Sequence, residues 1–252
     1  MRVYVYDGSF EGLLTVFHGL FRDKAEPLAI HRRGVAAQGF LAETVEVEAD
    51  PAKADALYEA MERRMTPRAV RLLYLAHLSE ERDGEMRLFA FVRRGGQLGE
   101  RLLDDLGDPG VAAVMRMANR VERERERFLG LVRFREAGTF FYAPIESTCR
   151  LLPLLGDHFA RRFPSMKWMI HDVGRKEALV YDEEEWYLTP CDLPGVTDFG
   201  PREAHYQHLW RTYFDVAAVE NRKSPERQRN RMPKKTWKWL VEIPRGKREP
   251  GV

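Results

Sequence analysis

The sequence contains few of the residues and segments that cross-link, anchor or export a protein. It has only two cysteines, Cys149 and Cys191, which are too few for a disulfide framework or, by themselves, for a zinc site. Its apolar runs are short and interrupted by charge, so no segment is expected to span a bilayer. The start, MRVYVYDGSF, lacks the apolar stretch and the cleavage site of a secretory signal. These features predict a cytoplasmic, reduced protein with no membrane contact.

The signatures of familiar catalysts and cofactor sites are also missing. The sequence has no G-x-S-x-G elbow, no C-x-x-C pair and no phosphate-binding loop. Among the histidines, only His205 and His208 are spaced to share one face of a helix, and no cysteine or paired-carboxylate motif stands beside them. We therefore predict no metal and no cofactor, and the sequence leaves open whether the chain is an enzyme.

Charge is plentiful but unevenly distributed along the chain. Residues 221–248 hold eleven Lys/Arg and two Glu, which gives this segment a local charge of +9. The rest of the chain holds 30 basic and 37 acidic residues, a balance of −7. Solubility alone does not require such segregation, so the asymmetry favours an anionic partner.

The first half of the sequence, residues 1–127, predicts a mostly helical region with an N-terminal strand. RVYVY at 2–6 alternates like a strand, and Asp7 or Ser9 is a capping residue for the helical pattern that follows. TVEVEA at 44–49 alternates again, which predicts a short strand–helix–strand unit.

The remainder of this half contains residues that typically start and end helices, which predicts several helices in succession. Asp50 and Thr66, each followed by proline, are start signals for two helices. Gly95 and Gly96 are expected to end a third helix, and a fourth is expected at about 110–127. Its last residues, RVERERERF, alternate in charge, which is typical of a solvated helix face.

The second half, residues 128–252, predicts a small antiparallel sheet with one covering helix. The helix is expected at 150–163. Strands are expected at 128–136, 139–146, 168–173 and 177–182, with a last one in EEWYLT. Helices and strands in this order indicate an α+β fold, built either from two domains, 1–127 and 128–252, or from one continuous domain.

A final helix precedes the basic segment and carries an aromatic stripe. Its apolar residues recur at helical spacing: Tyr206, Leu209, Trp210, Tyr213, Phe214 and Ala217. We expect this stripe to be buried, which would tether the basic segment to the folded body. The basic segment would then be an anchored surface.

Within this segment, NRKSPERQRNRMPKKTWKWL combines cations with aromatic side chains. The predicted nucleic-acid-binding residues are Arg222, Lys223, Arg227, Arg229, Arg231, Lys234, Lys235 and Lys238, as phosphate contacts, and Trp239, as a ring that stacks on an exposed base. The alternative is a surface coil followed by a short helix that packs on the body through Trp237, Leu240 and Val241. Basic segments also bind acidic proteins, so composition alone leaves both partners open.

Two other places contain residues that could do acid–base chemistry. Asp7 and Glu11 lie in the DGSFEG turn, where helix capping accounts for the polar residues. His171 and Asp172 lie near a predicted hairpin turn. Because neighbouring strand residues point to opposite faces, this pair is not expected to face one substrate.

Four strings of the sequence, in combination, resemble a bacterial family of probable DNA-metabolism or DNA-repair proteins. They are VYDGSFEGLLTVF, RFLGLVRFRE, FYAPIESTCRLLPLLGDHFARRFPSMKWMIHD and YQHLWRTYFDVAAVENRKSPERQRNRMPKKTWKWLVE. The resemblance extends from about residue 2 to about residue 243. None of these strings is a known catalytic signature.

The resemblance implies a function in DNA repair. Members of that family are typically partnered with a radical S-adenosylmethionine (SAM) protein similar to spore photoproduct lyase, and a related domain is fused to uracil-DNA-glycosylase-like modules. It implies DNA as a partner and carries over no catalytic residue. The expected function is a DNA-binding accessory protein that acts with the radical SAM partner. The alternatives are a DNA-modifying or lesion-processing enzyme with an unrecognised site, and a protein adapter without DNA affinity.

Overall fold

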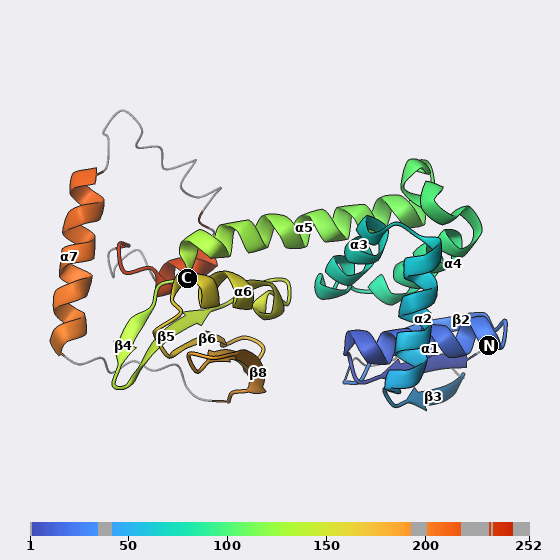
Figure 1. Ribbon diagram of the computed structural model, residues 1–252, viewed down its shortest axis with the longest axis horizontal. Coiled ribbons are helices and arrows are strands. Elements are labelled where there is room, and N and C mark those ends of the chain that lie inside the picture. Colours follow the sequence, from blue (N-terminus) through green and yellow to red (C-terminus); the bar gives the residue numbers. More distant parts are fainter. Residues whose placement is uncertain (1, 35–41, 193–200, 218–231, 233, 244–252) are drawn as a thin grey trace. The chain divides into compact units, whose positions relative to one another are not determined.

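The computed structural model describes residues 2–34, 42–192, 201–217, 232 and 234–243. The chain divides into two compact units, Met1–Glu122 and Arg123–Val252. Each unit combines helices with its own sheet, which confirms the α+β class (Figure 1). Across the described ranges, no helix has both the length and the apolar character needed to cross a bilayer.

The first unit is built on a three-stranded parallel sheet. Its strands are β1 (Arg2–Tyr6), β2 (Pro27–Arg32) and β3 (Glu43–Val47), in the order β2-β1-β3. Both neighbours run parallel to β1, and helix α1 (Phe10–Arg22) connects β1 to β2. The apolar face of α1, with Leu13, Phe17 and Leu20, is buried.

Capping at the start of α1 follows the sequence prediction. The Ser9 hydroxyl oxygen accepts the Gly12 backbone N–H at 2.8 Å, and the Asp7 carboxylate accepts the backbone N–H and the hydroxyl of Ser9. A Cβ at Gly12 would lie 2.3 Å from Asp7 Oδ1, so only glycine fits beneath this carboxylate. Asp7 and Ser9 thus satisfy the first turn of α1.

Strand β2 was not predicted, and it changes the expected strand–helix–strand unit. The crossover leads from β1 to β2, whereas β3 pairs with the other edge of β1. The sequence PLAIHR starts with proline and does not alternate, so it lacks the period-two pattern of a half-buried strand. Proline is tolerated here because it opens an edge strand.

Two of the helices that follow β3 begin where their capping residues predict. The helices are α2 (Pro51–Arg64), α3 (Pro67–Leu78), α4 (Gly84–Leu98) and α5 (Pro109–Leu131), with the short 3-10 helix η1 (Gly99–Asp104) before α5. Helix α5 contains residues of both units. Asp50 and Thr66 cap α2 and α3 through their side chains, as expected. The expected end of α4 at Gly95 and Gly96 is wrong. Gly95 lies inside the helix, where a Cβ would lie 2.6 Å from Met65 Sδ, so this glycine permits close packing.

The second unit contains a five-stranded mixed sheet. Its strands are β4 (Arg135–Ala137), β5 (Phe140–Ile145), β6 (Trp168–Asp172), β7 (Glu177–Tyr181) and β8 (Trp186–Pro190), in sequence order across the sheet. Three neighbouring pairs are antiparallel, but β5 and β6 are parallel and are connected by α6 (Leu152–Arg162). The sequence predicted a wholly antiparallel sheet, and this prediction is wrong for the pair β5 and β6, which run parallel.

The first strand predicted in this unit is also shorter than expected. Residues 128–131 complete α5, and β4 begins only at Arg135. Phe128 and Val132 are buried one helical turn apart, and the Val132 N–H donates to the Phe128 carbonyl. The run FLGLV therefore continues the period of the preceding helix.

The core of the second unit is rich in aromatic rings. Trp168, on β6, stacks on Tyr181 and contacts Phe134 and Phe159. Helix α6 packs on β7 and β8, and a Cβ at its Gly156 would lie 2.5 Å from the Trp186 ring. These rings and helix α6 therefore form the core against which the sheet of the second unit packs.

Two further elements complete the second unit. Helix α7 (Pro201–Ala217) contacts β4, and the 3-10 helix η3 (Lys234–Trp239) contacts β5. Leu240 and Val241, directly after η3, are buried as expected. Residues 240–243 therefore attach the C-terminal side of the basic segment to the body.

Candidate nucleic-acid interface

The predicted basic residues are only partly covered by the structure. Those outside the described residues are Arg222, Lys223, Arg227, Arg229 and Arg231, and the side chain of Lys235 is also outside them. Lys234 and Lys238 lie on η3 and are exposed. These two lysines are the described part of the predicted phosphate-binding surface.

The two tryptophans of η3 make different contacts. Trp237 donates its indole N–H to the Met232 carbonyl at 2.7 Å. Trp239 is half-buried, and the Lys238 ammonium lies 4.9 Å from the centroid of its ring. The same ammonium forms an ion pair with Glu146. Base stacking by Trp239 stays a prediction.

The aromatic stripe of α7 is exposed where the sequence predicted burial. The exposed fractions are 53% for Tyr206, 49% for Leu209 and 38% for Trp210. Spacing along a helix indicates which residues share a face, but it does not show that another element covers that face. The prediction that the stripe is buried is therefore wrong for these three residues. The side chains of Tyr213, Phe214 and Ala217 lie outside the described part of the chain.

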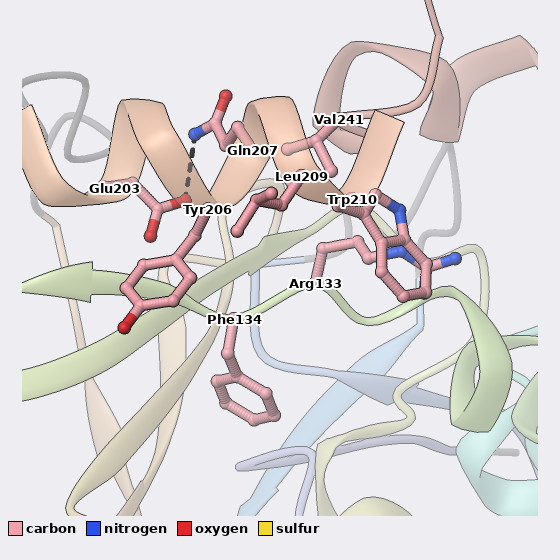
Figure 2. A pocket seen from close by; sticks show the side chains of 8 residues that line it. All are labelled: Arg133, Phe134, Glu203, Tyr206, Gln207, Leu209, Trp210 and Val241. Atoms are coloured by element: carbon pink, nitrogen blue, oxygen red, sulfur yellow. Dashed lines mark hydrogen bonds between the residues drawn. The ribbon is translucent and has the colours of Figure 1, made fainter. Parts of the chain in front are cut away.

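Polar contacts hold α7 in place instead. Glu203 is buried, and its carboxylate accepts the Glu136 backbone N–H of β4 at 3.0 Å. One turn later, Gln207 donates to the same carboxylate at 2.9 Å (Figure 2). Arg211 donates to the Val241 carbonyl at 2.8 Å. Glu203 and Arg211 thus attach the described part of α7 to β4 and to Val241, while its apolar side stays open.

The open side of α7 faces a cleft of about 570 Å³. The lining residues are Arg133, Phe134, Glu203, Tyr206, Gln207, Leu209, Trp210 and Val241. Figure 2 shows Tyr206 and Trp210 extending from α7 on either side of Leu209, with Phe134 opposite. The cleft therefore presents three aromatic side chains to one space.

A charged cluster fixes the orientation of Trp210. The Glu242 side chain is fully buried and accepts Arg133 Nη2 at 2.8 Å and Trp210 Nε1 at 3.3 Å. The Arg133 guanidinium also lies 5.3 Å from the centroid of the Trp210 ring, at cation–π distance. Glu242 thus balances the charge of Arg133, and Val241 of the cleft lining lies two residues after the end of η3.

The residues that line this cleft were not identified as a site from the sequence. The helical spacing of Tyr206 and Trp210 did indicate that they share one face, but their apolar character predicted that this face is part of the core. Arg133 and Phe134 lie in RFLGLVRFRE, which carries no recognisable site pattern. Only the fold brings these segments together with residues 240–243.

His171 and Asp172 do not form an acid–base pair. His171 is buried, with Nδ1 2.8 Å from the Tyr142 hydroxyl and Nε2 3.1 Å from the Cys191 carbonyl oxygen. Asp172 accepts hydrogen bonds from Ser147 and Arg175. The two side chains share no partner, in line with their expected orientation to opposite faces of β6. Across the described ranges, no three His, Cys, Asp or Glu residues are gathered closely enough to hold a metal ion.

Acidification is expected to destabilise the protein through His171. Burial lowers the pKa of His171 below the ordinary value of 6.5, more than its bond to Cys191 and the charge of Asp172 raise it. The unfolded chain therefore binds the proton more readily, and the free energy of unfolding should fall as the pH drops below about 6.5. Denaturant unfolding of the wild type and of His171→Gln between about pH 7.5 and about pH 5.5 measures this term.

The glutamine variant should be less stable near neutral pH, because the Tyr142 contact changes, but its stability should depend less on pH. His208→Gln, which replaces an exposed histidine of α7, is the control and should keep the pH dependence of the wild type. Equal pH dependence in the wild type and His171→Gln would contradict the assignment to His171.

Comparison with known proteins gives one family match. No curated protein and no solved structure matches the chain. A family described as a domain of unknown function, DUF4130, matches residues 82–242. The match covers more than half of the 252 residues and includes every residue that lines the cleft. The chain therefore belongs to the DUF4130 family.

Proposed function

We propose that the chain is a cytoplasmic DNA-binding accessory protein in bacterial DNA repair or metabolism, and that a radical SAM partner performs the chemistry. The observation that carries the proposal is the aromatic cleft of the second unit, whose lining includes Val241, two residues after η3 and within the basic segment 221–248. Proteins that bind single-stranded nucleic acid combine cations along the backbone path with rings on which bases stack. The sequence resemblance supports DNA as the nucleic acid and the radical SAM protein as the partner.

Lys234 is expected to contact a phosphate directly, and Lys238 is expected to do so when a phosphate replaces its Glu146 partner. Both are exposed on η3, and the flanking sequence carries the +9 charge of residues 221–248. Each lysine that neutralises a phosphate releases counterions, so binding should weaken as salt rises. Removal of both should lower the slope of log K against log salt by about 2, about 1 for each contact.

Fluorescence anisotropy with labelled single-stranded and duplex DNA, across a salt series, measures this slope. The test variant is Lys234→Ala/Lys238→Ala. The charge-matched control is Arg68→Ala/Lys167→Ala, which removes two exposed cations from outside η3. An unchanged slope in the test variant would argue against phosphate binding by η3, and no binding by the wild type at low salt would overturn the proposed function.

A protein adapter without DNA affinity is the second candidate. It is favoured by the exposed side chain of Leu209, which adds apolar surface between the two rings of α7. In this case the basic segment would bind an acidic face of the partner. Co-purification with the radical SAM protein that survives nuclease treatment, with no DNA binding by the isolated chain, would favour the adapter.

A further inference from the structure

Trp210 of α7 is exposed and yet held in place. Trp210 is restrained by its bond to Glu242 and by the guanidinium of Arg133. Tyr206 is more than half exposed, and Phe134 is half-buried at the end of the aromatic core. Ordering an aromatic side chain without burying it gains little for the fold. A fixed open ring is, however, suited to stacking on a planar ligand.

Tyr206 and Trp210 are one turn apart on α7, so both side chains extend toward the cleft, with Leu209 between them. Phe134 adds a third ring to the lining. A cleft lined by three aromatic rings offers a planar ligand more than one ring on which to stack. Figure 2 shows both side chains on the same side of α7, with Phe134 across the space between them.

We propose that the cleft takes one unstacked nucleobase of single-stranded DNA, held against the rings of Phe134, Tyr206 and Trp210. This inference rests on the proposed function and specifies its ligand. Residues 221–248, which include Val241 of the cleft lining, carry a local charge of +9 in the sequence, and this charge favours a nucleic acid over an apolar protein segment.

A base inside a duplex is less suited to this cleft. It is already stacked on both sides, and extrusion from the helix costs a few kcal/mol of pairing and stacking energy. Phosphate contacts made by η3 do not distinguish single-stranded from duplex DNA, because both forms present phosphates. Single-strand preference should therefore come from the cleft, and salt dependence should come from η3.

The test compares an oligonucleotide that carries bases with one of equal length built from abasic units, which keeps the phosphates. The wild type should bind the base-bearing strand about 5- to 150-fold more tightly, the range for one stacked base. Tyr206→Leu should lose most of this preference while its salt slope stays unchanged. This variant is safe for folding because Tyr206 is exposed and makes no hydrogen bond within the described part of the chain.

Two further variants separate stacking from structure. Trp210→Phe keeps a ring but removes the bond to Glu242, so it should retain most of the preference for bases. Tyr187→Leu removes an exposed tyrosine from β8, outside the cleft, and should have no effect. Quenching of tryptophan fluorescence by the base-bearing strand should be smaller in Trp210→Phe than in the wild type.

The outcomes distinguish the base pocket from the proposed function. Equal binding of the two strands by the wild type would overturn the base pocket while DNA binding stands. No binding of either strand would overturn both. Unchanged base preference in Tyr206→Leu would also overturn the base pocket, as would a protein partner whose binding this variant abolishes while DNA affinity is kept.

Discussion

Replacement of Asp172 by alanine is expected to lower the free energy of unfolding by about 3–5 kcal/mol. The Asp172 side chain is fully buried, and its Oδ2 accepts Ser147 Oγ at 2.6 Å and Arg175 Nη1 at 3.0 Å. Without this carboxylate, the mostly buried Arg175 guanidinium loses its ion pair with Asp172, and Ser147 loses an acceptor. Denaturant unfolding followed by tryptophan fluorescence measures the change.

Glu184→Ala is the control, because Glu184 is an exposed carboxylate in the same unit and its removal should change stability by no more than about 0.5 kcal/mol. A double-mutant cycle with Arg175→Met isolates the energy of the ion pair. If Asp172→Ala were as stable as Glu184→Ala, the carboxylate would not hold this turn together.

The same variant bears on the hypothesis that Asp172 does acid–base chemistry in an enzyme. A structural carboxylate should reduce stability when it is removed, whatever the activity of the chain. A catalytic carboxylate should instead be needed for turnover of a DNA lesion while the protein stays folded. The saturated hydrogen bonding of Asp172 favours the structural role.

Local signals were sufficient to predict most elements of the fold. The side chains of Ser9, Asp50 and Thr66 each accept a backbone N–H only three residues away, so their effect can be predicted without the tertiary structure. Strand β2 could not be predicted in this way, because it forms by pairing with β1 and no local pattern encodes that pairing. The parallel pairing of β5 with β6 is likewise a property of the crossover through α6.

The candidate site was harder to predict than the fold. Helical spacing placed Tyr206 and Trp210 on one face of α7, and this was correct. Burial of that face was inferred from hydrophobicity alone, whereas the helix is held by Glu203, Arg211 and the contact of Trp210 with Glu242. A site made of exposed apolar residues therefore has the same sequence pattern as a core helix, and only the fold distinguishes the two.

Glu124 is a charged residue whose burial the sequence pattern also failed to indicate. It lies in RVERERERF, which the alternation of charge assigned to a solvated helix face. Its side chain is instead buried, and its two carboxylate oxygens accept the backbone N–H groups of Thr148 and Cys149 at 2.8 Å each. One residue of the run thus fixes the loop that follows β5.

Glu124→Ala is expected to lower the free energy of unfolding by about 2–5 kcal/mol, because bonds to a charged acceptor are worth about 1.5–3 kcal/mol each and the Cys149 donor is buried. Denaturant unfolding gives the magnitude. Amide hydrogen exchange should show faster exchange at Thr148 and Cys149, which locates the effect.

The run itself supplies the matched control, since Glu126 lies two residues further along α5 and is exposed. Glu126→Ala should change stability by no more than about 0.5 kcal/mol. Glu124→Gln keeps one oxygen acceptor and turns an NH₂ group toward the other backbone N–H, so it should cost less than alanine but more than Glu126→Ala. If the alanine variants at 124 and 126 proved equally stable, the alternating run would be solvated throughout and the loop after β5 would be held by other contacts.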